Sequence, residues 1–288
     1  MQRPPVQKRS ALVTGCSSGI GLATARLLRD RGWQVVPTAR KDEDLDRLRT
    51  DGFEPVRLDV GDAASVAEAA GRALELMGGA IGGLVNNAGF AQPGALEDVG
   101  RDALRLQFEV NVFGAMDLAR CVIPVMRRQG WGRIVNISSV LGRVAIPFNG
   151  SYCATKFALE ALSDALRVEL WASGIGVILV EPGPIVSRFR SNAAAQARSS
   201  LDLDRARYSA FYRREIDRRI AQQKKPDFLT RQPEDVARKV LHALESRRPR
   251  RRYCVTLPAY AGALLSRFAP AAFLDWVNLR KRSNTADS

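Results

Sequence analysis

The residues whose types and spacing most clearly suggest chemistry are Tyr152 and Lys156, in the stretch S-Y-C-A-T-K. Four residues apart on one helix, the two side chains would lie on the same face, one turn apart. A phenol with a pKa of about 10 exchanges protons poorly at neutral pH, but a neighbouring ammonium favours the phenolate and lowers that pKa. The pair therefore predicts an acid–base catalyst that does not use histidine.

A serine pair upstream supports this prediction. Ser138 and Ser139 close a predicted strand, so that Ser139 could hold the substrate oxygen while Tyr152 transfers the proton. Taken singly, the tyrosine and lysine could be an ordinary helix-surface pair, and the serine an uninvolved strand end. The only histidine, His242, lies in a predicted surface helix, and we interpret it as structural. This excludes most mechanisms that depend on histidine.

Three glycines, Gly15, Gly19 and Gly21, lie where the first predicted strand meets the first helix. A pyrophosphate can bind there to exposed backbone N–H groups and to the positive end of the helix. Glycine is needed because a Cβ would block the turn, the approach of the phosphate or the helix–strand packing. The spacing is G-x-x-x-G-x-G rather than G-x-G-x-x-G, and a structural turn is the alternative interpretation.

The residue after the second predicted strand bears on the choice of cofactor. Enzymes that use NAD usually place a carboxylate there, to accept the ribose hydroxyls. This chain has Ala39 followed by Arg40 and Lys41. A guanidinium can bind a 2′-phosphate through two parallel hydrogen bonds, so NADP(H) is favoured over NAD(H). An ordinary surface arginine is the alternative.

The remaining composition sets the class of protein. The 288 residues carry a formal charge of +14, of which residues 182–288 contribute most, with 23 Lys and Arg against 10 Asp and Glu. Such an asymmetry indicates an anionic partner, nucleic acid or membrane head groups, or else an arginine-rich solvated face. The basic third lacks interleaved aromatic residues and any known nucleic-acid module, which argues against nucleic acid.

The cysteines and the chain start predict a cytoplasmic protein. The four cysteines have no C-x-x-C pairing, so neither a disulfide framework nor a metal site is expected; they are Cys16, Cys121, Cys153 and Cys254. The first residues lack the apolar region and cleavage site of a signal peptide. Residues 258–277 are interrupted by charges and proline, so we expect them to lie on a membrane rather than cross one.

Short apolar strands alternate with amphipathic helices along the chain. We expect strands at residues 11–13, 33–38, 53–58, 133–138, 177–180 and 253–257, with another ending at 85. We expect helices at residues 20–31, 45–49, 63–77, 101–129, 152–173 and 233–246. This alternation predicts an α/β, doubly wound fold, a parallel sheet flanked by helices on both faces, in which the polar clusters that follow the strands meet at one rim.

Together these motifs resemble the classical short-chain dehydrogenases/reductases, over residues 8–257. The resemblance rests on T-G-C-S-S-G-I-G (14–21), L-D-V (58–60), N-N-A-G (86–89), V-N-V-F-G around Asn111, I-S-S (137–139), Y-C-A-T-K (152–156) and E-P-G-P (181–184). It implies a single Rossmann-type domain with a C-terminal extension at 258–288. Within the family, the chain is most similar to the branch of bacterial NADP-dependent aldehyde reductases and hydroxysteroid and retinol dehydrogenases, which act on apolar alcohols and carbonyls.

The resemblance implies a catalytic tetrad of Asn111, Ser139, Tyr152 and Lys156. Tyr152 would donate the proton in reduction and accept it in oxidation, and Ser139 would orient the carbonyl. Lys156 would bind the nicotinamide ribose and tune the tyrosine, while Asn111 would hold a water of the proton relay. The segment at 187–225 would form a mobile lid over the substrate.

The resemblance also implies the cofactor-binding residues, with Asp59 and Val60 at the adenine and residues 182–185 at the nicotinamide. The carboxamide partner is commonly a threonine in the family, and Ser187 takes its place here. The full set is Gly15, Ser17, Ser18, Gly19, Ile20, Gly21, Arg40, Asp59, Val60, Asn87, Ala88, Gly89, Tyr152, Lys156, Pro182, Gly183, Ile185 and Ser187.

The leading hypothesis is therefore an NADP(H)-dependent oxidoreductase that interconverts an apolar aldehyde or ketone and its alcohol. The alternatives are an NAD-linked dehydrogenase of steroid- or retinoid-type alcohols and a non-catalytic nucleotide-sensing protein. A homodimer and a homotetramer are both compatible with the sequence. The run R-R-P-R-R-R at 247–252, followed by an apolar stretch that includes Trp276, predicts reversible association with anionic membranes.

Overall fold

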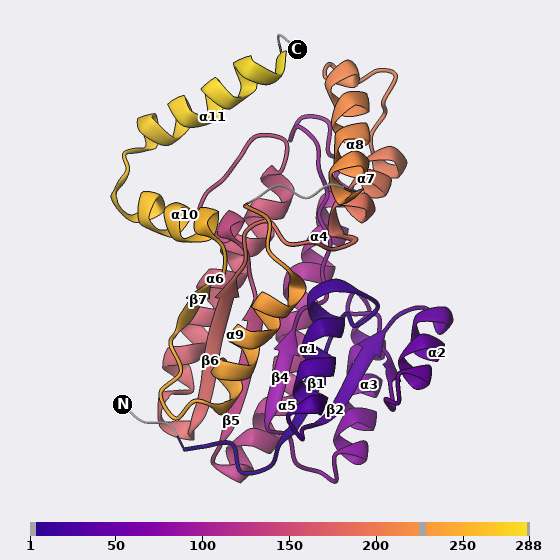
Figure 1. Ribbon diagram of the computed structural model, residues 1–288, viewed down its shortest axis with the longest axis vertical. Helices are drawn as coiled ribbons and strands as arrows, with labels where there is room; N and C mark the ends of the chain where they lie inside the picture. Colours follow the sequence, from indigo (N-terminus) through magenta and orange to yellow (C-terminus); the bar gives the residue numbers. More distant parts are fainter. Residues whose placement is uncertain (1–3, 225–228, 287–288) are drawn as a thin grey trace.

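Seven parallel strands form one sheet within residues 4–224 and 229–286, the part of the chain that the computed structural model describes (Figure 1). Their order across the sheet is β3-β2-β1-β4-β5-β6-β7. The strands are β1 (Ser10–Val13), β2 (Gln34–Ala39), β3 (Val56–Arg57), β4 (Gly83–Asn86), β5 (Gly132–Ile137), β6 (Ile175–Glu181) and β7 (Arg252–Cys254). The strand order reverses between β1 and β4, and ligands of such sheets bind beyond the carboxyl ends of the strands at this point.

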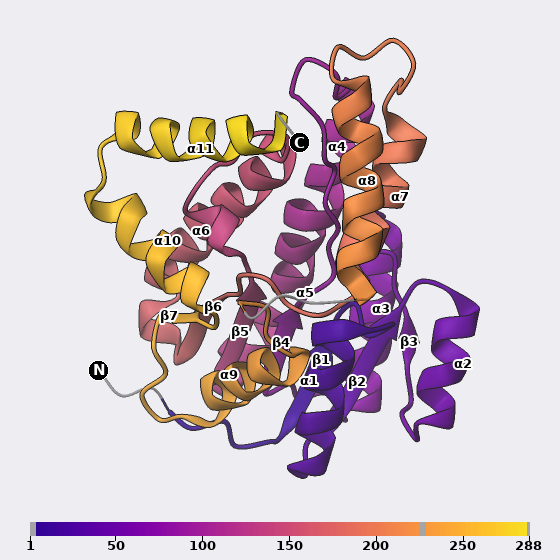
Figure 2. The ribbon, with the colours of Figure 1, turned by 45° about the horizontal axis from the view of Figure 1, so that its top comes forward.

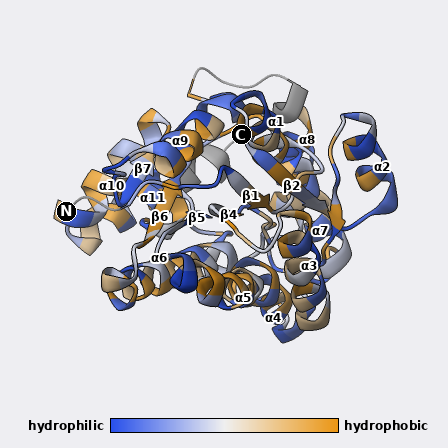
Figure 3. Cartoon of the chain, turned by 90° about the horizontal axis from the view of Figure 1, so that it is seen from below, coloured by the Kyte–Doolittle hydropathy of each residue, from blue (hydrophilic) through white to orange (hydrophobic). Residues whose placement is uncertain are grey.

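Helices cover both faces of the sheet, as Figure 3 shows in a view from below. Helices α1 (Gly19–Asp30) and α9 (Pro233–Glu245) pack together on one face, where α2 (Asp42–Thr50) joins the same apolar cluster. Helices α3 (Ala63–Leu76), α5 (Gly114–Gln129) and α6 (Gly150–Glu169) cover the other face. Each large side chain buried in these layers contributes about 1.5–3 kcal/mol. The predicted doubly wound fold and single domain are confirmed.

Some predicted boundaries were wrong. The second helix begins at Asp42 rather than near 45, because three acidic residues occupy its first turn, where the helix dipole favours them. The strand expected at 53–58 is only Val56–Arg57. The single helix expected at 101–129 is α4 (Arg101–Phe108) and α5, separated by a π-turn, η1 (Glu109–Phe113). The helix expected at 152–173 starts at Gly150 and ends in the 3-10 turn η3 (Trp171–Ser173).

The last third of the chain adds helices around the carboxyl end of the sheet (Figures 1 and 2). Helices α7 (Phe189–Ser200) and α8 (Ser209–Lys224) lie together at this end. The strand expected at 253–257 stops at Cys254, because the hydroxyl of Thr256 caps α10 (Leu257–Phe268), which is followed by α11 (Ala271–Ala286). Among the described residues, no helix combines the length and the apolar character needed to cross a bilayer.

Candidate active site

The glycine-rich loop between β1 and α1 is closely packed. Gly15 and Gly19 adopt positive φ angles of 70° and 59°, which side chains rarely allow. A Cβ on Gly21 would lie 2.3 Å from the carbonyl oxygen of Gly15. Ser17, Ser18 and Ile20 are half-buried on the same loop, where α1 begins. The loop thus has the close backbone approach and the helix N-terminus that a dinucleotide pyrophosphate requires.

The N-N-A-G segment after β4 is hydrogen-bonded to this loop. The side-chain amide of Asn87 donates to the carbonyl oxygens of Thr14 at 2.8 Å and Gly15 at 3.1 Å. The backbone N–H groups of Asn87 and Ala88 both donate to Thr14 Oγ1, at 2.9 Å. At Gly89, a Cβ would lie 2.9 Å from Asn111 Oδ1. Three segments distant in sequence therefore meet at the switch point.

Arg40 and Asp59 face each other at the ends of β2 and β3. Arg40 Nη1 lies 3.6 Å from Asp59 Oδ2, and the side chains are 67% and 41% exposed. Val60, the next residue, is half-buried. Arg57 was missed in the sequence analysis, although it pairs with Ala39 in the sheet and its Nη1 donates to the carbonyl oxygen of Arg40 at 2.9 Å. Two guanidinium groups therefore lie at the edge where the adenosine is expected.

The serine, tyrosine and lysine of the predicted tetrad come together on η2 (Val140–Gly142) and α6. Ser139 caps η2, accepting a hydrogen bond from the N–H of Leu141 at 3.1 Å, and its side chain is hydrogen-bonded to Tyr152. Lys156 Nζ lies 5.7 Å from the centre of the Tyr152 ring and donates to the carbonyl oxygen of Ile137 at 2.9 Å. All three are buried, with exposures of 9% or less.

Burial shifts the proton equilibria of this pair. It raises the pKa of Tyr152, because the phenolate would lose its hydration, and the hydrogen bond from Ser139 only partly opposes this. The net shift of the Tyr152 pKa is therefore upward, opposite to the lowering expected from its lysine neighbour, because burial outweighs the other contributions. Burial lowers the pKa of Lys156 to about 8, against the opposing attraction of Glu160.

Asn111 lies in the π-turn η1, a rare geometry that is frequent at functional sites. Both N–H groups of its side-chain amide and one lone pair of the amide oxygen bind protein groups. Nδ2 donates to Phe90 O at 2.9 Å and to Thr155 Oγ1 at 3.1 Å, while Oδ1 accepts from the N–H of Phe90 at 3.0 Å. The side chain therefore joins the catalytic helix to the segment after N-N-A-G.

The segment that should meet the nicotinamide follows β6. The carbonyl oxygen of Pro182 accepts from the N–H of Val140, at 2.9 Å. A Cβ on Gly183 would lie 2.1 Å from Thr256 Oγ1. Ile185 is buried and forms a β-bridge with Arg231. Ser187 contacts the glycine loop: a Cβ added to Gly19 would lie 3.0 Å from the Cβ of Ser187. The segment after β6 thus reaches the glycine loop at the carboxyl end of the sheet.

The family model for short chain dehydrogenases matches residues 9–198. The oxidoreductase YbbO of Escherichia coli is 40% identical over 270 residues, covering 94% of this chain and 94% of its own. Human 17-beta-hydroxysteroid dehydrogenase type 1 is 36% identical, over 85% of this chain and 76% of its own. A short chain dehydrogenase/reductase from Burkholderia phymatum, solved in complex with NAD, superposes with a TM-score of 0.74 at 27% identity, covering 92% of this chain and 93% of that one.

The chain is a short-chain dehydrogenase/reductase. It belongs with the classical members of the family and is related to hydroxysteroid and retinol dehydrogenases. It is therefore an oxidoreductase of a family that uses nicotinamide nucleotide cofactors.

Next to the predicted tetrad lies a network of ion pairs around two buried glutamates, which the sequence analysis missed. Glu160, one turn after Lys156, and Glu181, the last residue of β6, are 6% and 1% exposed. Arg252 lies 3.0 Å from Glu160 Oε2 and 3.0 Å from Glu181 Oε1, and it also pairs with Asp164 at 2.7 Å. Arg143 pairs with Glu181 at 3.1 Å. Burial, and then the charge of Glu181, raises the pKa of Glu160.

This network joins the segments that carry the chemistry. Glu160 lies on the helix of Tyr152 and Lys156, Glu181 directly precedes Pro182, and Arg143 directly follows η2. The spacing of Lys156 and Glu160, four residues apart, was a signal for it in the sequence. Arg252 was hidden in the arginine run, where nothing distinguishes it from its neighbours.

The side chains that pack around Tyr152 are apolar. The Phe189 ring packs edge-on against that of Tyr152, with centroids 5.5 Å apart. Ala91 and Ala193 are buried in the same cluster, and Leu141 packs against it. The hydroxyls of Ser139 and Tyr152 therefore lie at the edge of an apolar wall, part of which belongs to α7.

Helices α7 and α8, within the lid expected at 187–225, are packed onto the rim. The hydroxyl of Tyr212 donates to Asp98 and accepts from the N–H of Ala95 at 2.9 Å. The ring of Phe148, a residue with a positive φ of 59°, lies 4.2 Å from that of Phe211. An aromatic cluster thus fastens the two helices to the loops before α4 and α6. Lys225, the last residue of the expected lid, lies outside the described residues.

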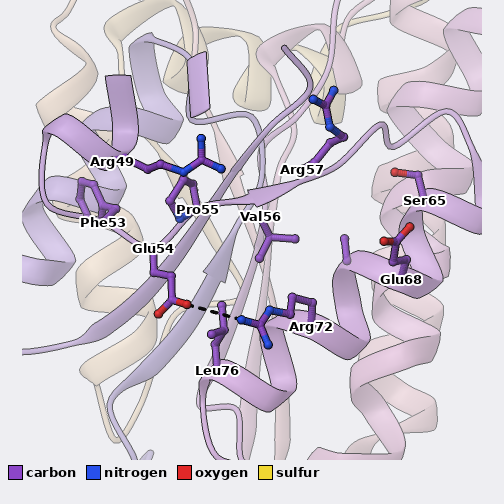
Figure 4. Close-up of a pocket in the computed structure, with 11 residues that line it drawn as sticks. Arg49, Phe53, Glu54, Pro55, Val56, Arg57, Ser65, Glu68, Arg72 and Leu76 are labelled. Atoms are coloured by element: carbon purple, nitrogen blue, oxygen red, sulfur yellow. Dashed lines mark ion pairs between the residues drawn. The ribbon is translucent and has the colours of Figure 1, made fainter. Parts of the chain in front are cut away.

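Two further features of the dehydrogenase lie apart from the tetrad. His242 Nδ1 lies 2.8 Å from the hydroxyl of Tyr253, at the far end of α9, which supports its structural interpretation. Figure 4 shows a hollow beside the edge strand β3, where Arg72 pairs with Glu54 at 3.6 Å. None of the predicted catalytic residues lines this hollow. Across the described ranges, no three side chains among His, Cys, Asp and Glu are grouped to hold a metal ion.

Proposed function

We propose that this dehydrogenase interconverts an apolar aldehyde or ketone and its alcohol with NADP(H), using Tyr152 as the acid and base. The observation that carries the proposal is the pairing of two hydroxyls, on Ser139 and Tyr152, with an apolar wall made by Leu141, Ala91 and Phe189. A carbonyl oxygen can accept from both hydroxyls while its apolar substituents lie against the wall. Such a site favours apolar carbonyls over charged ones.

In the proposed mechanism, the glycine loop, N-N-A-G and Ser187 hold the dinucleotide, whose nicotinamide supplies or accepts a hydride when bound. In reduction, the phenol of Tyr152 gives its proton to the carbonyl oxygen, and Ser139 orients that oxygen. The raised pKa of Tyr152 keeps the phenol protonated at neutral pH, as a donor must be. The phenolate that remains is stabilised by the ammonium of Lys156 until a proton arrives from water, which we assign to the relay through Asn111.

The NADP(H) preference is proposed from the edge near β2 and β3. Arg40 is two-thirds exposed and pairs with one carboxylate, at 3.6 Å, which is a weak surface interaction. A 2′-phosphate offers it stronger charge-assisted hydrogen bonds. Arg57 lies beside it as a second cation; its side chain is 56% exposed and pairs with Asp42. The NAD-linked alternative is favoured by Asp59, whose carboxylate could accept ribose hydroxyls instead.

Residues 187–225 are proposed as the substrate lid, as the contact of Phe189 with the Tyr152 ring supports. A lid that carries Phe189 would keep water from the reacting centre when it closes over the substrate. The four cysteines have no disulfide partner, in keeping with the proposed cytoplasmic location.

A homodimer is proposed through the outer face of α6. Four large apolar side chains are exposed along this helix and η3, which a second copy would cover. They are Phe157, Leu162, Val168 and Trp171, at 43%, 39%, 65% and 49% exposure.

A spectrophotometric screen tests the proposal. The purified protein is mixed with NADPH or NADH and with aldehydes of increasing chain length, or with steroid and retinoid carbonyls. We expect kcat/KM to be larger with NADPH and to increase with the length of the apolar chain. A preference for NADH together with steroids or retinoids would favour the NAD-linked alternative. The absence of turnover with every carbonyl, despite cofactor binding, would favour the nucleotide-sensing alternative.

A further inference from the structure

Helix α10 buries its small residues and exposes its large apolar ones, the reverse of the usual pattern in a globular protein. It turns small residues inward, because Ala259 and Gly262 are buried, and a Cβ on Gly262 would lie 2.5 Å from Val140 Cγ2 of η2. Its large apolar residues point outward along one face, at helical spacing. They are Leu257, Tyr260, Leu264 and Phe268, at 71%, 55%, 62% and 71% exposure.

Helix α11 continues this exposed surface. Phe273, Trp276 and Leu279 are 43%, 47% and 62% exposed. The helix extends away from the sheet across the top of the molecule (Figures 1 and 2). It is joined to the body by a hydrogen bond from Asn278 Nδ2 to the carbonyl oxygen of Ala145, at 3.2 Å. Large apolar side chains exposed together on two successive helices mark a site that something else covers.

Cations lie among these rings. The Arg280 guanidinium lies 4.0 Å from the centre of the Trp276 ring, and that of Arg267 lies 5.7 Å from the Phe268 ring. Phe273 and Trp276 stack, with centroids 5.9 Å apart. Aromatic rings beside arginines suit the boundary between acyl chains and anionic head groups, where the ring is buried and the cation stays at the head group.

The arginine run at 247–252 is not part of this surface. Arg252 is taken up by the buried network, and the carbonyl oxygen of Arg251 accepts from the N–H of Leu179 inside β6. The run precedes β7 at the opposite end of the sheet from α10 and α11 (Figure 1). The sequence-based expectation that the run and the apolar stretch act together was therefore wrong, because β7 separates them.

We propose that α10 and α11 form a docking surface for an anionic lipid bilayer. The outward residues of α10 and α11 would lie among the acyl chains, and Arg267 and Arg280 at the head groups. Because α10 packs on η2, directly after Ser139, docking brings the rim of the active site close to the bilayer. Apolar substrates partition into that same phase. The docking itself does not depend on turnover or on the proposed cofactor preference.

The test is co-sedimentation of the full chain with vesicles of phosphatidylcholine alone and of phosphatidylcholine with phosphatidylserine, at low and high salt. We expect binding to the anionic vesicles that falls as salt rises. The double variant Leu264→Glu, Phe268→Glu should reduce the bound fraction by on the order of tenfold or more, because two apolar side chains are withdrawn from the lipid. Leu106→Glu is the matched control, since Leu106 is 46% exposed but lies on α4 rather than on α10, α11 or the proposed dimer face.

Three results would overturn the proposal. Equal binding to neutral and anionic vesicles would remove the role of charge. An equal loss with Leu106→Glu would mean that any apolar surface residue suffices. Loss of self-association in the Leu264 and Phe268 variant, measured by light scattering and without vesicle binding in the parent, would show that a second copy covers the surface. Circular dichroism and turnover of each variant separate these results from misfolding.

Discussion

The two ends of the proposed dinucleotide site are built in opposite ways. At the catalytic end, the carboxylates of Glu160 and Glu181 are almost fully buried, and Arg252 pairs with both. At the adenosine end, Arg40 and Asp59 form one ion pair at 3.6 Å, and their side chains are 67% and 41% exposed. Buried charges bind strongly to fixed partners and are costly to leave alone, whereas exposed pairs contribute about 0–1 kcal/mol.

This difference indicates which side chains the fold holds at fixed positions and which can be changed without loss of stability. The catalytic end needs hydroxyls and an ammonium held at fixed positions, and a buried network that joins four segments provides this. The adenosine end only has to distinguish a phosphate from a hydroxyl, which one exposed side chain can do. Cofactor preference should therefore change without loss of stability, while a change in the network should damage both stability and turnover.

The largest effect is expected from Arg252→Met. The methionine fills similar space but leaves the buried carboxylates of Glu160 and Glu181 with Arg143 as their remaining counter-charge. The free energy of unfolding should fall by about 3 kcal/mol, the lower end of the range for breaking a buried ion pair. Denaturant unfolding measures the loss. Arg251→Met, one residue earlier and exposed, is the control and should change stability little. Equal values for the two variants would mean that the network contributes nothing particular.

The second-largest effect is expected from Tyr152→Phe. Removal of the phenol hydroxyl should lower kcat by at least on the order of 10²-fold, the usual contribution of a general acid–base group, with cofactor binding largely retained. Steady-state kinetics and cofactor titration measure the two quantities. Tyr253→Phe is a matched control, because Tyr253 is also buried and hydrogen-bonded, but to His242. Near-normal turnover by the Tyr152 variant would refute the proposed mechanism.

The same contrast explains what the sequence could predict. The glycine loop, N-N-A-G, Ser139 and Tyr152 were predictable, because these motifs follow strands, and parallel strands bring their carboxyl ends to one rim. The network was not, because Arg252 and Glu160 are 92 residues apart and meet only through the packing of β7 on β6. The inward-facing small residues of α10 were also hidden. Helical spacing identifies a stripe of large apolar residues but not which way the stripe faces.

At the adenosine end, Arg40→Leu should weaken NADPH binding by about 1.5–3 kcal/mol, the range for hydrogen bonds to charged groups, and change NADH binding little. Its unfolding free energy should stay close to that of the parent, because Arg40 is exposed. Fluorescence titration with both cofactors makes the measurement. Arg57→Leu, tested alongside, shows whether the second guanidinium also contributes. Equal losses for NADPH and NADH would show that Arg40 does not bind the 2′-phosphate.

The smallest effect is expected from salt, which should weaken cofactor binding at the adenosine end and leave the catalytic end unchanged. Mobile ions screen exposed charges over about 8 Å at physiological ionic strength but barely reach buried ones. Raising the NaCl concentration from about 0.05 to 0.5 M should therefore increase the KM for NADPH a few-fold, on the order of 1 kcal/mol or less, and leave the KM for NADH nearly unchanged. The stability difference between the parent and Arg252→Met should persist at both concentrations. If that difference disappeared in high salt, water and ions would have access to the network, and the proposed contrast between the two ends would fail.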